Sequence, residues 1–146
     1  MIIFLLGILT VLGFAPFYLF PVPVITLALL LGFCRKSRTP LQAALMGFCF
    51  GMGLFSAGVT WIYVSLHDFG AMPMPIAVIA LIILCAYLAI FPALSIGILA
   101  RFRLASPFVW ASIAAALWML FEWLRGSLFT GFPWLALGYS QAPFSP

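Results

Sequence analysis

The sequence predicts an all-α protein, a polytopic transmembrane helical bundle to which this chain contributes about five membrane helices. Three observations lead to this fold class. Of the 146 residues, 67% are hydrophobic and only 5% are charged, and the mean hydropathy is +1.33. About a quarter of the residues of a soluble protein are charged, so a soluble domain is excluded, and a disordered chain is excluded by the same values. The apolar residues also form long runs between short breaks, and a bilayer is the solvent that such runs require.

The first apolar stretch is predicted to be a hairpin of two short helices. A run over residues 1–15 is followed by Pro16, Pro21 and Pro23, and a second run ends at Cys34. Proline inside a helix removes a backbone hydrogen bond and clashes with the preceding turn, so one continuous rod is disfavoured. The stretch also lacks the charged start and small-residue cleavage site of a signal peptide.

Three longer runs follow, and each is able to span a bilayer. Residues 41–66 carry no charge, and a helix of that length is roughly 39 Å long, which is enough to cross with tilt. The break HDFGAMPMP precedes a second uncharged run over 76–100, in which Pro92 is expected to introduce a kink. A third run covers 106–124, and the chain after it is rich in Gly, Pro and aromatic residues.

The basic residues predict the topology of these helices. Five of the six lie in two short breaks, namely Arg35, Lys36, Arg38, Arg101 and Arg103. Lys and Arg concentrate on the cytoplasmic side of membrane proteins, which places both breaks and Met1 inside and puts residues 67–75 and the chain from Glu122 onwards outside. Nucleic-acid binding is not expected, because it requires a basic face exposed to water.

Groups able to do chemistry are scarce. The chain has one Glu, one Asp, one Lys and one His. Lys36 and Glu122 are predicted to lie on opposite sides of about 30 Å of hydrocarbon. His67 adjoins Asp68, but no nucleophile is evident beside them, and an interfacial polar turn is the favoured interpretation. No catalytic residue, metal site or cofactor is therefore predicted. Three cysteines without a CxxC motif are interpreted as small hydrophobic residues, namely Cys34, Cys49 and Cys85.

The strongest candidates for function lie near the end of the last long run. Glu122 and Arg125 stand three apart, a spacing at which two side chains on a helix meet and can form an ion pair. Such a pair either anchors the helix at the interface, or it binds a lipid head group or organises the following loop. Around it gather Trp118, Trp123, Phe129, Phe132, Trp134 and Tyr139. These rings fit an aromatic belt equally as well as a re-entrant segment that holds acyl chains.

Small residues in the first half of the 41–66 run predict close helix packing. Gly47 and Gly51 form a GxxxG motif, which is expected to contact a neighbouring helix of the same chain. Homodimerisation is the weaker interpretation of this motif. Trp61 and Tyr63 follow in TWIYVS, where anchoring at the membrane interface is favoured over a role in substrate binding.

Four strings resemble the apolipoprotein N-acyltransferase family, and they follow one another in the family's order over nearly the whole chain. They are GFAPFYLFP at 13–21, GFCFGMGLFSAGVTWIYVSLHDFGAMP at 47–73, AYLAIFPAL at 86–94 and EWLRGSLFTGFPWLALGYSQ at 122–141. The resemblance implies a bacterial inner-membrane protein with an eight-helix membrane domain and an extracytoplasmic nitrilase-like domain that holds a Glu-Lys-Cys triad. The triad cysteine takes an acyl chain from a phospholipid and passes it to the N-terminal diacylglyceryl-cysteine of an apolipoprotein.

The resemblance assigns residues 1–146 to the N-terminal part of that membrane domain, without the nitrilase-like domain. The chain alone is then expected to be inactive, and its partners are membrane phospholipid and, through the whole enzyme, an apolipoprotein. Residues matching the last string are expected to face substrate at the outer leaflet, namely Glu122, Arg125, Phe132, Pro133, Trp134 and Tyr139. The alternative is a non-enzymatic helical membrane module, such as an assembly factor or part of a transporter.

Overall fold

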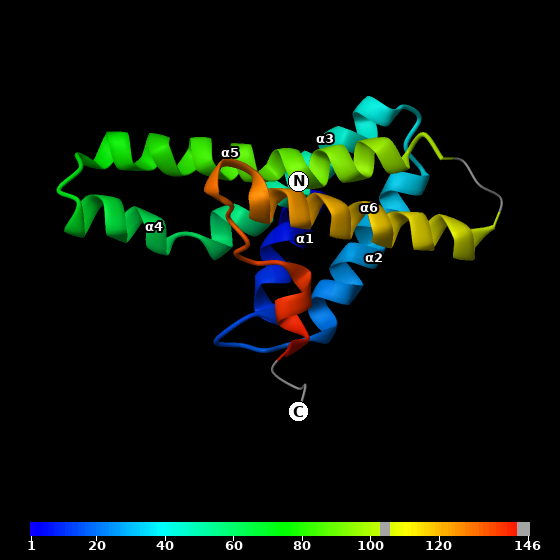
Figure 1. Ribbon diagram of the computed structural model, residues 1–146, viewed down its shortest axis with the longest axis horizontal. Helices are drawn as coiled ribbons and strands as arrows, with labels where there is room; N and C mark the ends of the chain where they lie inside the picture. Colours follow the sequence, from blue (N-terminus) through cyan, green and yellow to red (C-terminus); the bar gives the residue numbers. More distant parts are fainter. Residues whose placement is uncertain (103–105, 143–146) are drawn as a thin grey trace.

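Proline marks the start of four of the helices. Pro lies within the first two positions of α2 (Pro21–Arg35), α3 (Pro40–Gly58), α5 (Met74–Leu99) and α6 (Pro107–Ser127). Its fixed backbone angle suits the first turn, where no amide hydrogen bond is lost. The computed structural model describes residues 1–102 and 106–142, which contain helices and turns and no strand (Figure 1). The predicted all-α class is confirmed.

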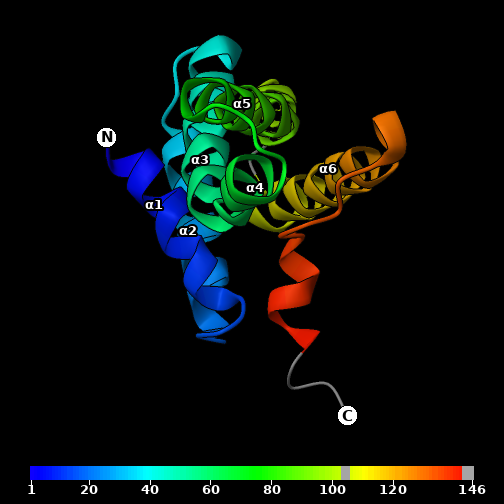
Figure 2. The ribbon, with the colours of Figure 1, turned by 90° about the vertical axis from the view of Figure 1, so that its left-hand side faces the viewer.

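Among the described helices, α3, α5 and α6 are long and apolar enough to cross a membrane, whereas two apolar helices are shorter. These two are α1 (Ile2–Thr10, extended by a 3₁₀ turn over Val11–Gly13) and α2. They form the predicted hairpin, which runs crosswise to α3 and α5 (Figures 1 and 2). The hydroxyls of Thr10 and Thr26, both buried, join the two arms with a 2.7 Å hydrogen bond.

Helix α3 is the centre of the bundle, and glycine lets both of its neighbours approach its backbone closely. Gly47 and Gly51 face Pro92 and Ala89 of α5, and Gly53 lies against the backbone of α1. The most extensive helix packing is between α3 and α5, followed by α1 with α3 and α5 with α6. The prediction that the GxxxG motif packs within the chain is confirmed.

The prediction of one helix over 41–66 was wrong at its second half. Helix α3 ends at Gly58, Val59 leaves the helical region with φ −119° and ψ 20°, and α4 (Trp61–Val64) continues into a π-helical turn over Ser65–Phe69. Glycine and β-branched residues are weak helix formers, and Gly58–Val59–Thr60 places three of them together. Because the π-helical turn includes His67 and Asp68, the predicted break over 67–75 shortens to 70–73.

The basic segments of α2 and α5 lie at the same end of the bundle. Helix α2 ends at Arg35, whose guanidinium lies 5.7 Å from the ring centroid of Trp110 in the first turn of α6. Arg101 follows α5 at that end, and segment 70–73 lies at the opposite end (Figure 1). Arg103, which was used in the same prediction, lies outside the described residues. This arrangement fits the prediction that two membrane spans separate the two basic segments. That the basic end faces the cytoplasm stays a prediction.

Candidate functional site

The chain reverses direction after α6 and folds back against the bundle. We call residues 128–141 the return loop. Its turn uses the left-handed backbone region at Phe129, Thr130 and Gly131, where φ is 50°, 75° and 80°. At Gly131 a Cβ atom would also collide with the Gly126 carbonyl, so only glycine fits. A backbone bond from Phe132 N to Arg125 O, 2.9 Å long, closes the turn.

Arg125 fastens the return loop to α6 from the inside. Its side chain is only 2% exposed, and its Nη1 donates to the backbone oxygens of Phe132 and Trp134, each at 2.7 Å. The guanidinium carbon lies 5.2 Å from the ring centroid of Phe55 on α3. A buried charge is tolerated only where partners replace its hydration, and here two carbonyl dipoles and an aromatic face do so.

Glu122 holds the same loop one turn earlier on α6. Its Oε1 accepts a 2.9 Å hydrogen bond from the backbone N–H of Leu137, where a 3₁₀ turn over Leu137–Ser140 begins. The expected Glu122–Arg125 ion pair was wrong: between these two described residues no contact of ion-pair length forms, because each side chain binds loop backbone instead. Of the alternatives left open, these contacts support the one in which the two residues organise the following loop, while binding of a lipid head group stays a prediction.

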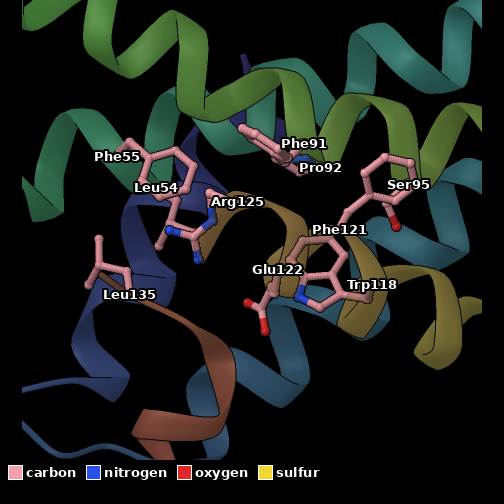
Figure 3. A pocket seen from close by; sticks show the side chains of 10 residues that line it. All are labelled: Leu54, Phe55, Phe91, Pro92, Ser95, Trp118, Phe121, Glu122, Arg125 and Leu135. Atoms are coloured by element: carbon pink, nitrogen blue, oxygen red, sulfur yellow. The ribbon is translucent and has the colours of Figure 1, made fainter. Parts of the chain in front are cut away.

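A small cavity lies where these charged groups meet the bundle core. It has a volume of about 20 Å³, which is room for no more than a water-sized molecule. Its walls come from α3, α5, α6 and the return loop, and Figure 3 shows Arg125 near Phe55 and Leu135, and Glu122 beside Trp118. This cavity is too small for a substrate, although Glu122 also lines a larger opening of about 240 Å³.

A larger opening lies between the return loop, α4 and the α1–α2 turn. We call it the aromatic groove. Its volume is about 410 Å³, and its lining residues are Val11, Phe14, Ala15, Tyr18, Gly58, Trp61, Trp134, Leu135 and Tyr139. The rings of Trp61 and Trp134 are 5.6 Å apart between centroids. One wall comes from the α1–α2 turn and the other from α4 and the return loop, so segments far apart in sequence build it.

The structure separates the six predicted site residues into groups. Trp134 and Tyr139 line the aromatic groove and are 51% and 57% exposed. Phe132 packs against the hydrophobic core, Pro133 is exposed on the surface, and Glu122 and Arg125 bind loop backbone as described. The six residues therefore lie on one segment and its support, but only two of them line the aromatic groove.

Sequence reasoning missed the opposite wall of the groove. Phe14 and Tyr18 belong to the α1–α2 turn, and nothing local in the sequence indicates that this turn meets residues 134–139. The aromatic and proline-rich composition of GFAPFYLFP was the available signal. Gln141 links the two walls, since its Nε2 donates to the backbone oxygen of Phe20 at 3.0 Å.

The comparisons with known proteins all point to the same family. A family model described as the apolipoprotein N-acyltransferase N-terminal domain matches residues 6–146. The chain is 67% identical over 143 residues, 98% of its length, to the apolipoprotein N-acyltransferase of Nitrosomonas europaea, of which it covers 29%. It is 43% identical over 146 residues to that of Vibrio vulnificus and 45% identical over 139 residues to that of Coxiella burnetii, covering 96% and 92% of this chain. The chain spans 29% and 28% of those two relatives.

Proposed function

Because the chain belongs to the apolipoprotein N-acyltransferase family through its N-terminal domain, we propose that it is the N-terminal part of the membrane domain of such an enzyme. That enzyme transfers a fatty acyl chain from a phospholipid to the N-terminal diacylglyceryl-cysteine of an apolipoprotein. The match of the family model over residues 6–146 is the observation that carries this proposal. The role of residues 1–146 is to hold the enzyme in the membrane and to present the acyl donor.

The aromatic groove supports a role in holding the acyl donor. Trp134 and Tyr139 present amphipathic rings beside a volume of about 410 Å³, and the groove floor includes Gly58 and Leu135. Rings with an apolar body and a polar tip suit the depth at which lipid head groups meet acyl chains. We place the acyl chain of the phospholipid between Tyr18 and Trp134.

The covalent chemistry belongs to groups outside residues 1–146. In the first step a thiolate attacks the acyl ester carbonyl, the ester C–O bond breaks, and a lysophospholipid leaves as the thioester forms. In the second step the α-amino group of the apolipoprotein attacks the thioester, the C–S bond breaks, and an amide and the thiol result. These steps require a thiolate, a base and an oxyanion stabiliser in one polar site. We assign them to a nitrilase-like domain beyond the described helices.

An acyl-transfer assay tests the assignment. The chain of 146 residues and the product of the whole reading frame are each given phospholipid vesicles and a diacylglyceryl-cysteine peptide. We expect amide formation with the whole product only. The 146-residue chain has a single Glu and a single Lys, and these two residues are predicted to lie on opposite sides of the membrane, so they cannot form one catalytic site. Turnover by the 146-residue chain would contradict the assignment, and a reading frame that ends at Pro146 would favour a non-enzymatic module such as an assembly factor.

We further propose that the protein lies in the inner membrane of a bacterium, with the basic end of the bundle and Met1 in the cytoplasm. The concentration of Arg35, Lys36 and Arg101 at one end supports this orientation. A phosphatase reporter joined after Tyr139 is expected to be active only outside the cytoplasm, and one joined after Arg101 is expected to be inactive. The reverse pattern would remove the outer-leaflet role of the return loop.

A further inference from the structure

We propose that Arg125 is a positioning residue for Trp134. It acts on the acyl donor only through the return loop, by holding the Trp134 backbone in place so that the indole faces the aromatic groove. This inference rests on the proposed function in one respect, namely that Trp134 contacts the donor. The positioning itself stands on the contacts of Arg125 and does not depend on the reaction.

The first step of the argument concerns where the bonds of Arg125 fall. One nitrogen, Nη1, reaches the carbonyls on either side of Pro133, at Phe132 and at Trp134, each at 2.7 Å. Both carbonyls therefore point toward α6. The Trp134 ring instead lies 5.6 Å from that of Trp61, on the groove side of the loop. A single side chain thus fixes the orientation of the peptide unit that follows Trp134.

The second step concerns why the loop needs such a support. Leu135 has φ 59°, an uncommon backbone angle for a residue with a side chain, and Pro133 has no N–H to donate. The segment therefore lacks the regular hydrogen bonds of a helix or a strand. Its other described anchors include the bond from Leu137 N to Glu122, the Leu135 side chain packed at Gly58, and the bond from Ala136 N to Pro133 O. Trp134 is held at its ring by contact with Trp61 and at its backbone oxygen by Arg125.

The third step excludes direct contact between Arg125 and the donor. The side chain is 2% exposed and does not line the aromatic groove. Its surroundings are the Phe55 ring and the small cavity of about 20 Å³, which admits no lipid. An effect of Arg125 on the use of phospholipid must therefore pass through the loop.

The fourth step predicts which replacements of Arg125 still hold the return loop in place. Lysine keeps the charge and offers three donors on a flexible stem, so it is able to reach at least one of the two carbonyls. Methionine fills similar space without a donor, and it leaves both carbonyls without their partner. The series Arg125→Lys and Arg125→Met therefore separates hydrogen bonding to the loop from occupation of the volume.

The experiment uses the full-length enzyme in detergent and two measurements that are independent of each other. Near-ultraviolet circular dichroism detects the coupling of the Trp61 and Trp134 indoles, which Trp61→Phe removes and so identifies. Steady-state acyl transfer gives KM and kcat for a phosphatidylethanolamine donor. Arg101→Met, at the exposed opposite end of the bundle, is the matched control for loss of an arginine.

We expect Arg125→Met to abolish the Trp–Trp signal and to raise the donor KM about tenfold, which corresponds to roughly 1.4 kcal/mol, with kcat largely kept. Arg125→Lys should recover at least half of the signal and most of the KM. Arg101→Met should match the wild type in both. A folded Arg125→Met enzyme with the signal and KM of the wild type overturns the proposal. If Arg125→Met does not fold, a folded Arg125→Lys enzyme without the signal overturns it.

The two measurements also distinguish a failure of this inference from a failure of the proposed function. If the unmodified full-length protein transfers no acyl chain, the function is wrong, while the dichroism of the same variants still decides whether Arg125 positions Trp134.

Discussion

Replacing Gly47 with leucine is expected to destabilise the helical bundle by roughly 3 kcal/mol, the upper part of the range for overpacked cores. A Cβ atom at this position would lie 2.5 Å from the backbone oxygen of Pro92 and 2.9 Å from its carbonyl carbon. Backbone atoms inside a helix have no rotamer to change, so α3 and α5 must separate. This contact is the most extensive helix pair in the fold, which is why one side chain has so large an effect.

The matched control is Gly32→Leu on α2, because a Cβ atom at Gly32 meets nothing within 4 Å. Thermal unfolding of the purified protein in detergent measures the result. We expect G47L to lower the melting temperature clearly, and G32L to leave it near the wild-type value. A wild-type melting temperature in G47L would show that α3 and α5 do not pack through this glycine.

On the proposed acyl-transfer function, replacing Trp134 with alanine in the full-length protein is expected to lower kcat/KM at least thirtyfold. That factor corresponds to roughly 2 kcal/mol, which is typical when an aromatic residue central to a binding site is truncated. The indole lines the aromatic groove and lies against Trp61. Because the side chain is half exposed, its loss should change the melting temperature little.

Trp123→Ala on α6 is the control for this variant, since Trp123 is 65% exposed and does not line the aromatic groove. Acyl transfer is measured per amount of folded protein, so that a fall in expression is not counted as a fall in activity. If W134A and W123A lose activity only in proportion to protein level, the aromatic residues act as an interfacial belt and not as a site for lipid.

The local sequence predicted most of the helices because each depends on near neighbours. Prolines mark the starts of α2, α3 and α6, and apolar runs define the lengths of α5 and α6, which differ from the predicted ranges by three residues or fewer. The same reasoning failed after Gly58, where hydropathy continues but the helix does not. Apolar composition indicates that a segment lies in lipid, but it does not indicate where a helix ends or changes direction within an apolar run.

The candidate site was predicted by segment and not by geometry. The spacing of Glu122 and Arg125 correctly placed them on one helix face. It did not indicate that Arg125 would bind carbonyl groups of the return loop, or that Glu122 would bind a backbone amide there, in place of an ion pair. Phe14 and Tyr18 were not selected, because their meeting with Trp134 depends on how the α1–α2 hairpin crosses α3. Contacts between segments more than 100 residues apart leave no periodic signal in the chain.

The hydrogen bond from Gln141 to the Phe20 carbonyl has a consequence for entry into the aromatic groove. The bond is exposed and joins the two walls at one edge, whereas the walls are otherwise carried by separate parts of the fold, the α1–α2 turn and the return loop. Ser140, the residue before Gln141, is fully buried and lies near Gly13 of the same hairpin, so the two walls stay joined when the Gln141 bond is broken. Two contacts therefore close this edge of the groove, and of the two only the Gln141 bond is exposed.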